Sequence, residues 1–416
     1  MRLRALAPIG PALALLVPAT ASADWSAPAT LSARDAAAYG SPDVATEAGR
    51  GLAAWVRVAP GAAGGAGRVQ VASRLGASSR WLAPATLTGP GASAPRVALN
   101  ARGDAAVAWV RGRSVMAGVR RGPEGRWSVS RAAAAGGPVT GARLVVDRSG
   151  RPTLLWSEGR GGGFVARIAA RRSAGAGWVV RPSRLAASAD SRPALALSPS
   201  AGALVSWVDG GRARLAGTAR GAFGRPVMLS SEAAGTPASA LAPGGVFATW
   251  SAELPGGTSV VLASDRSASS GSWSRPRDIG IGTAPAVALA DDGDAVVAWN
   301  LALPGEPQGI EAATRAGRGA WRATTIVDRQ ECECSLAVAD VAIDPEGTAL
   351  VSWRRDGGDG GGRGGASALA RGGSWRAAGV GVAELSAPPV VATGGAPGGM
   401  AIWVEARAGV RAATLR

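Results

Sequence analysis

Hydrophobic and polar positions follow a unit of about 50 residues that recurs eight times along the chain. In one copy, residues 95–99 and 105–109 are runs of small and β-branched residues, separated by the polar, Gly-containing segment 100–104. Short apolar runs bounded by turn residues indicate buried strands. We therefore predict that each copy begins with a hairpin of two buried strands.

Aromatic residues mark two fixed positions in this unit. A tryptophan closes the second apolar run of every copy: Trp55, Trp109, Trp156, Trp207, Trp250, Trp299, Trp353 and Trp403. A second aromatic position follows a Gly- or Ser-rich turn: Trp25, Trp81, Trp127, Trp178, Phe223, Trp273, Trp321 and Trp375. Between the two positions lies a third strand that ends in arginine: Arg74, Arg120, Arg171, Arg220, Arg266, Arg315, Arg371 and Arg416. Each copy thus contains four short strands, and we assign a packing role to the first tryptophan.

Repeats of four strands without helical periodicity are typical of a β-propeller. We predict one all-β domain over residues 24–416 with eight four-stranded blades, or seven if a degenerate copy at Phe223 or Trp321 does not form a blade of its own. The first strand, near residues 25–31, has the pattern of a fourth strand, and the last copy lacks one. We expect this N-terminal strand to complete the last blade and so close the ring, which removes exposed sheet edges.

The turn before the second aromatic position carries a family resemblance. Residues 266–276 contain serines, a glycine and Trp273, and this segment resembles the Asp-box repeat of sialidase-like propellers, although the aspartate is generally missing. The resemblance spans the propeller region and implies the propeller fold. Sialidases use a tyrosine nucleophile that is usually late in the chain. Because Tyr39 is the one tyrosine here and comes early, the sequence does not favour sialidase chemistry.

The N-terminus has the features of an export signal. Arg2 and Arg4 precede an apolar run over 12–17, and Ala21-Ser22-Ala23 fits a cleavage site, so residues 1–23 are predicted to be a signal peptide. We expect a secreted protein of the extracellular space or cell envelope. No later stretch approaches the roughly 20 apolar residues of a membrane span, and we expect a monomer.

The formal net charge is +16, and the basic residues are all arginines. An excess of positive charge favours anionic partners, so we consider an anionic polysaccharide, a cell-wall polymer or a surface protein. The arginines are spread along the chain rather than clustered, which argues against a nucleic-acid track. The alternative is that many arginines are structural, since eight of them end the third strands.

The sequence lacks residues that several common catalytic and metal sites require. The chain contains no histidine, which excludes Ser-His-Asp hydrolysis and most zinc sites. We predict no catalytic residues, no metal and no cofactor. Cys332 and Cys334 are too few soft ligands for a metal site, and in an exported protein we predict that they form a local disulfide. Asp291, Asp292 and Asp294 are interpreted as a polar turn on the face opposite the usual propeller site.

One set of charged residues remains as a candidate site. Two residues beyond the first tryptophan, six copies carry a charge: Arg57, Arg111, Glu158, Asp209, Arg355 and Glu405. Residues i and i+2 of a strand share a side, so these six residues are predicted to ring one mouth of the channel and to bind a ligand. The alternative is that they are solvated strand ends.

These observations favour a secreted, non-catalytic recognition module that binds an extracellular glycan, polymer or surface partner. We expect binding through the face that carries the loops after the second and fourth strands of each blade, called here the loop face. One alternative is a glycoside hydrolase or lyase on a sialidase-like propeller, using carboxylates and arginines of that face. A second alternative is a purely structural surface protein without a saturable ligand.

Overall fold

The computed structural model describes residues 25–415, apart from residues 34, 63–64, 174–175, 220–221, 268–270, 302, 304–307, 323–324, 331–333, 358–361, 371–372, 378–383, 395–397 and 407. The predicted signal peptide, residues 1–23, lies outside the described residues. Across the part of the chain that the structure describes, no helix is long and apolar enough to cross a membrane.

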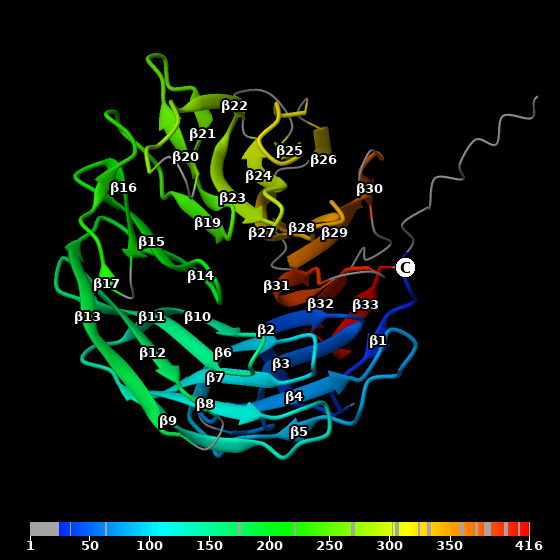
Figure 1. The fold of residues 1–416 in the computed structure, drawn as a ribbon. Helices are drawn as coiled ribbons and strands as arrows, with labels where there is room; N and C mark the ends of the chain where they lie inside the picture. Colours follow the sequence, from blue (N-terminus) through cyan, green and yellow to red (C-terminus); the bar gives the residue numbers. More distant parts are fainter. Residues whose placement is uncertain are drawn as a thin grey trace, which may run out of the picture.

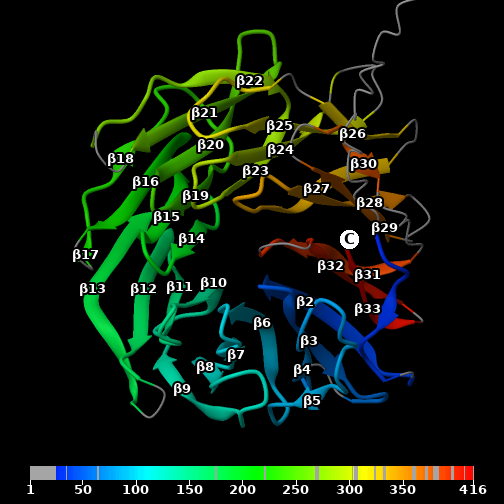
Figure 2. The same cartoon turned by 45° about the vertical axis from the view of Figure 1, so that its right-hand side comes forward.

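Eight antiparallel sheets stand in a ring, with the first strand of each sheet toward the centre (Figures 1 and 2). Blade 1 comprises β2 (Ala38–Glu47), β3 (Arg50–Val58), β4 (Arg68–Arg74) and β5 (Ala85–Thr86). Blade 2 comprises β6 (Ala92–Leu99), β7 (Ala105–Arg111), β8 (Ser114–Arg120) and β9 (Ser128–Ala134). Blade 3 comprises β10 (Val139–Val146), β11 (Pro152–Arg160), β12 (Gly163–Arg171) and β13 (Trp178–Ser188). Blade 4 comprises β14 (Ala194–Ser198), β15 (Gly202–Asp209), β16 (Arg212–Ala219) and β17 (Ala222–Phe223), with β18 (Val227–Met228) also paired to β16.

The second half repeats this order. Blade 5 comprises β19 (Ala238–Ala242), β20 (Gly245–Glu253), β21 (Ser259–Ser267) and β22 (Arg277–Ile281). Blade 6 comprises β23 (Thr283–Leu289), β24 (Ala295–Leu301), β25 (Gln308–Arg315) and β26 (Thr325–Gln330). Blade 7 comprises β27 (Cys334–Ile343), β28 (Ala349–Gly357), β29 (Gly362–Leu369) and β30 (Arg376–Ala377). Blade 8 comprises β31 (Leu385–Ala392), β32 (Met400–Glu405), β33 (Gly409–Thr414) and β1 (Ala29–Thr30). The predicted all-β propeller of eight blades is confirmed.

The ring closes through the N-terminal strand, as predicted. Ala29 and Thr30 of β1 pair with Ala412 and Arg411 of β33, and Trp25 pairs with Leu415. Two serines extend the seam: Ser26 Oγ accepts the N–H of Thr414 and Ser32 Oγ accepts the N–H of Val410, each at 3.0 Å. Strands from the two ends of the chain therefore build one blade.

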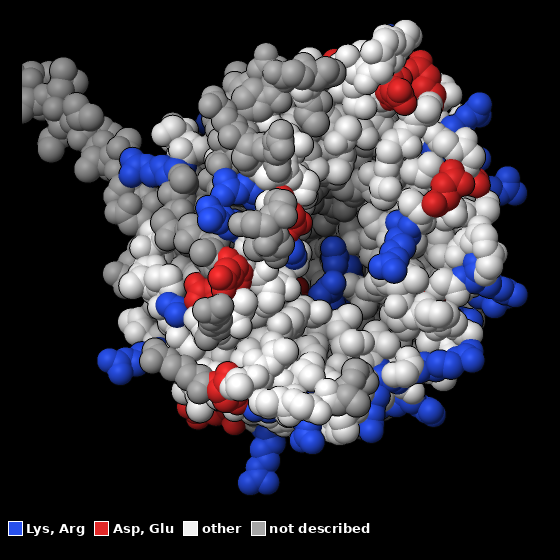
Figure 3. All heavy atoms as spheres, turned by 180° about the vertical axis from the view of Figure 1, so that it is seen from behind, with Lys and Arg blue, Asp and Glu red and all other residues white. Residues whose placement is uncertain are grey.

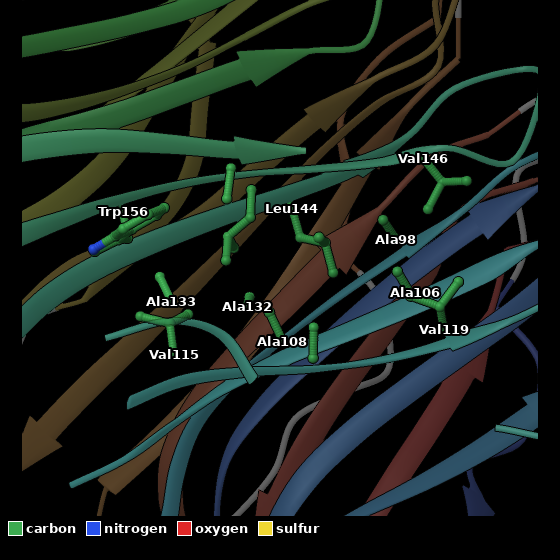
Figure 4. Close-up of a cluster of buried hydrophobic side chains, with 13 residues drawn as sticks. Ala98, Ala106, Ala108, Val115, Val119, Ala132, Ala133, Leu144, Val146 and Trp156 are labelled. Carbon is green, nitrogen blue, oxygen red and sulfur yellow. The ribbon is translucent and has the colours of Figure 1, made fainter. Parts of the chain in front are cut away.

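The core lies between neighbouring blades and combines large tryptophans with many alanines. Figure 4 shows one such cluster, in which Ala106, Ala108 and Val115 of blade 2 face Leu144 and Trp156 of blade 3. Across the ring, the eight first-position tryptophans are 0–7% exposed. Alanine and valine let the sheets approach closely, and the indoles fill the remaining space at about 150–250 Å² of buried surface each.

Arginines that end the third strands stack on tryptophans and contact the preceding blade. The guanidinium of Arg120 stacks over Trp127 at 4.9 Å from the ring centroid, and its Nη1 donates to Ser73 Oγ of blade 1 at 3.0 Å. Arg315 stacks over Trp321 at 5.4 Å and lies 3.7 Å from Asp265 of blade 5. Part of the positive charge therefore serves contacts between blades, whereas Arg220, Arg371 and Arg416 lie outside the described residues.

The closing strand generates a testable prediction. Deleting residues 24–32 removes β1 and leaves β33 as an exposed sheet edge, which favours aggregation. We expect a clearly lower melting temperature or concentration-dependent aggregation, measured by calorimetry and light scattering against a control chain that lacks only residues 1–23. A melting curve that matches the control would show that β1 does not close the ring.

Candidate functional site

The six predicted ligand residues, called here the mouth residues, all lie on second strands of their blades beyond the buried tryptophan. Arg57 lies in β3, Arg111 ends β7, Glu158 lies in β11, Asp209 ends β15, Arg355 lies in β28 and Glu405 ends β32. The structure thus places them at equivalent heights in six blades, but their surroundings differ with the sign of the charge.

Glu158 has internal partners for both carboxylate oxygens. Its Oε1 accepts the indole N–H of Trp156 at 2.8 Å, and its Oε2 accepts the N–H of Gly136 at 2.8 Å. The residue is 3% exposed, and the Nε of Arg167 lies 3.5 Å from Oε1. A sugar hydroxyl could reach this carboxylate only by breaking contacts that already satisfy it.

The other two acidic mouth residues also have hydrogen-bond or ion-pair partners within the protein. Asp209 lies 2.9 Å from the Nε of Arg214 and accepts the hydroxyl of Ser188 at 2.7 Å, while Glu405 accepts the indole N–H of Trp403 at 3.3 Å. In each of these three blades an arginine stands directly opposite the tryptophan on the third strand: Arg167, Arg214 and Arg411. In the blades with a basic mouth residue, the facing residues are Gln70, Met116 and Gly365. An acidic mouth residue therefore occurs together with its own arginine.

The basic mouth residues differ in exposure. Arg111 is exposed at the end of β7, and Arg355 is half-buried. Arg57 forms an ion pair with Asp35 at 2.5 Å in a partly exposed position. Whether the six residues bind a ligand stays a prediction.

Tyr39 belongs to the same corner as Arg57. Its hydroxyl donates to Oδ1 of Asp35 at 2.7 Å, and this bond together with the Arg57 guanidinium lowers the pKa of Asp35 to about 2. Burial raises the pKa of Tyr39 above its ordinary value. A phenol with a raised pKa stays protonated, so this tyrosine is not prepared to act as a nucleophile.

A second constellation lies inside the channel. In each blade, one residue of the innermost strand stands opposite the residue that precedes the buried tryptophan, and these eight residues form one level of the channel wall, called here the channel ring. They are Asp43, Arg96, Arg143, Ala194, Ala238, Ala286, Asp340 and Val390. All eight line a cavity of about 560 Å³. Figure 3 shows the central hollow with basic side chains at its wall.

Contacts to the next blade hold three of the four charged ring residues in place. Oδ2 of Asp43 accepts the N–H of Val97 at 2.7 Å, and Oδ2 of Asp340 accepts the N–H of Val391 at 3.1 Å. Arg96 Nε donates to the carbonyl of Ala142 at 3.3 Å. These bonds fix the charges on the wall of the channel, where water still reaches them.

The surrounding protein shifts the pKa values of three of these groups. Burial, with the neighbouring Asp43 carboxylate adding to it, raises the pKa of Asp340 to about 6. Burial also raises the pKa of Asp43, and burial together with the Arg96 charge lowers the pKa of Arg143. Within the described residues, no two of the four form an ion pair at 4 Å or less. Their charges interact electrostatically across the channel without direct contact.

The sequence interpretation missed the channel ring, although a signal exists. Arg96, Arg143 and Asp340 each lie 13 residues before the tryptophan of their own copy, and Asp43 lies 12 before Trp55. In the other copies the equivalent residues are apolar: Ala194, Ala286 and Val390 lie 13 residues before their tryptophans, and Ala238 lies 12 before Trp250. Aligning the copies on their tryptophans would have shown charged residues in an otherwise apolar strand.

Among the described residues, the other candidate groups form no metal site. Asp294 is buried, and its Oδ1 accepts the N–H of Gly317 at 2.7 Å, which agrees with the polar-turn interpretation. Within the described ranges, no group of three or more His, Cys, Asp or Glu residues could hold a metal ion. Cys334 begins β27, but Cys332 lies outside the described residues, so the disulfide stays a prediction.

Comparisons with known proteins support the fold. No family model and no curated protein matches the sequence. Among solved structures, an ulvan lyase of polysaccharide lyase family 25 matches with a TM-score of 0.50 at 10% identity over 92% of this chain and 95% of the lyase. The Dos1 propeller matches with a TM-score of 0.50 at 8% identity over 94% and 95%. The Hadza microbial sialidase Hz136 matches with a TM-score of 0.38 at 12% identity over 63% of each chain. At these identities, the two matches with a TM-score of 0.50 show a propeller fold and nothing about activity.

The contact between Trp156 and Glu158 generates a prediction. Replacing Trp156 with Phe removes the indole donor and leaves a buried carboxylate short of a partner, which costs about 1–3 kcal/mol beyond the lost packing. Trp109 is the matched control, because its buried indole nitrogen has no hydrogen-bond partner among the described residues. We expect Trp156→Phe to lower the free energy of unfolding in urea by more than Trp109→Phe. Equal losses would show that the bond to Glu158 contributes nothing to stability.

Proposed function

We propose that this protein is an exported, non-catalytic recognition module whose loop face binds an anionic extracellular polymer. One observation carries the proposal: the acidic mouth residues have internal partners, whereas Arg111 is exposed and has no hydrogen bond or ion pair with any described residue. Among the mouth residues, an arginine rather than a carboxylate is therefore available to a ligand. Export is part of the proposal and is supported by the signal-like residues 1–23.

Arg57 and Arg111 come from neighbouring blades and present planar guanidinium groups, which suit the bidentate binding of carboxylate or sulfate. The partly exposed ion pair of Arg57 with Asp35 is no obstacle, because such pairs contribute little to stability and an anionic group of a ligand can replace the carboxylate. The net charge of +16 would also steer an anionic polymer toward the molecule.

Cleavage of a polysaccharide is the second candidate function, and one observation favours it. Asp340 has a pKa of about 6 in a cavity that also holds two arginines, and a carboxyl group with such a pKa is suited to proton transfer near neutral pH. Against this role, Asp340 already accepts the N–H groups of Val391 and Val341. We therefore prefer the binding role and treat cleavage as an outcome of the test.

The test compares two exposed arginines on opposite faces. Arg111→Ala should weaken binding to carboxylated and sulfated polysaccharides about tenfold or more, because a charge-assisted contact contributes roughly 1.5–3 kcal/mol. Arg148→Ala is the control, since this exposed arginine lies in the turn between β10 and β11 on the other face. Titration calorimetry measures binding, and neither variant should change the melting temperature.

Two outcomes would overturn the binding role. Wild-type protein that binds none of these polysaccharides, or Arg111→Ala protein that binds as wild type does, contradicts the proposed site. Release of cleaved products by the wild type, lost in Asp340→Asn, would establish the enzymatic alternative instead.

A further inference from the structure

We propose that the channel ring binds a small zwitterionic ligand of the amino-acid class. This site differs from the loop face in position and in ligand, and it does not depend on polymer binding there.

The charges of the channel ring are separated into two poles. The inner strands contact one another in the order β2, β6, β10, β14, β19, β23, β27, β31 and back to β2. Asp340 and Asp43 therefore flank Val390 on blades 7 and 1, and Arg96 and Arg143 follow on blades 2 and 3. In a ring of eight blades, blade 3 stands opposite blade 7, so Arg143 faces Asp340 across the channel. Ala194, Ala238 and Ala286 form an apolar wall between these two residues.

The charge balance of the ring selects a dipolar ligand. Two arginines and two ionised aspartates have no net charge. Water still reaches all four groups, but the surrounding protein wall strengthens the attraction of each charge to an opposite charge held in the channel. A ligand that carries one carboxylate and one ammonium group supplies a counter-charge to each pole and keeps the site neutral. A ligand with only an anion leaves the acidic pole without a partner, and a ligand with only a cation leaves the basic pole without one.

Hydrogen-bonding capacity remains at both poles. A guanidinium has five N–H donors and a carboxylate has about four lone-pair positions. Among the described contacts, Arg143 donates only to the carbonyl of its neighbour Ala142 at 3.4 Å, and Asp43 accepts only the N–H of Val97. Several donors and acceptors therefore remain available to a ligand in the channel.

A purely structural role explains three of the four residues but not Arg143. Asp43, Asp340 and Arg96 bond to the following blade, whereas the one described hydrogen bond of Arg143 stays within its own strand. Its side chain is exposed to the solvent of the channel, and the Asp340 and Asp43 charges favour its ionisation while the Arg96 charge opposes it. An exposed cation that makes no described contact between blades is available to a ligand in the channel.

The size of the site agrees with a small ligand. The cavity of about 560 Å³ lies within the range of roughly 300–1,000 Å³ that is typical of small-molecule sites. The alanines of the apolar wall leave room for an aliphatic side chain. The ligand would place its carboxylate at Arg96 and Arg143, its ammonium group at Asp43 and Asp340, and its side chain against the alanines.

The experiment uses ligands that differ in charge. L-leucine and L-alanyl-L-alanine carry both charges, N-acetyl-leucine carries only the anion, and leucine amide carries only the cation. By titration calorimetry at pH 7, we expect at least one of the two zwitterions to bind at least tenfold more tightly than either single-charge analogue. Binding should weaken at pH 5, because Asp340 is then mostly protonated and no longer pairs with the ammonium group.

Single substitutions test whether the zwitterion binds at the channel ring. Arg143→Met should weaken zwitterion binding at least tenfold while the protein keeps its fold, because the side chain makes no hydrogen bond to a described residue of another blade. Arg148→Met, which changes an exposed arginine of the same blade, should bind as wild type does. Arg111→Ala should also keep zwitterion binding, and Arg143→Met should keep polymer binding, so that failure at one site is distinct from failure at the other.

Three results would overturn the inference. N-acetyl-leucine that binds as tightly as the zwitterions would show an anion site without a dipolar preference. Absence of binding for both zwitterions, or unchanged binding in folded Arg143→Met protein, would show that the four charges serve only the structure.

Discussion

The whole structure depends on placing one large apolar side chain at the same point of every blade. The sheets are built mainly from alanine and valine, which bury little surface individually, and the buried tryptophan supplies the volume that fills each interface between blades. Because adjacent blades meet through this indole, its regular recurrence fixes the angle between sheets. Eight similar interfaces then close a ring, and β1 completes the sheet of the last blade.

In a closed ring, residues that are far apart in the sequence come together when they occupy equivalent positions in their blades. Asp43, Arg96, Arg143 and Asp340 are far apart in the chain, yet each stands opposite the residue that precedes a buried tryptophan. They therefore reach the same level of the channel. The residues that determine stability and the residues that carry charge are thus placed by one repeated register, and the outer loops vary without disturbing it.

The propeller could be predicted from sequence because its signals are local and repeated: apolar runs, turns and tryptophans at constant spacing. The environment of individual charges could not. Glu158 and Arg57 occupy equivalent positions, but one accepts an indole N–H inside the blade and the other pairs with Asp35 near the surface. That difference arises from the facing residue on the third strand, Arg167 or Gln70, and depends on strand register. The two poles of the channel ring likewise depend on the order of blades around a closed circle.

The central claim is that equal tryptophan-filled interfaces make the eight blades one cooperative unit. Hydrogen exchange followed by mass spectrometry tests it most directly, because slow amides report the free energy of opening for each strand. The account predicts that the amides of the second and third strands are protected to a similar degree in all blades, with β32 and β33 as slow as β7 and β8. Fast exchange confined to β31–β33, with the other blades protected, would show that the ring is open at the seam between the chain ends and would contradict the account.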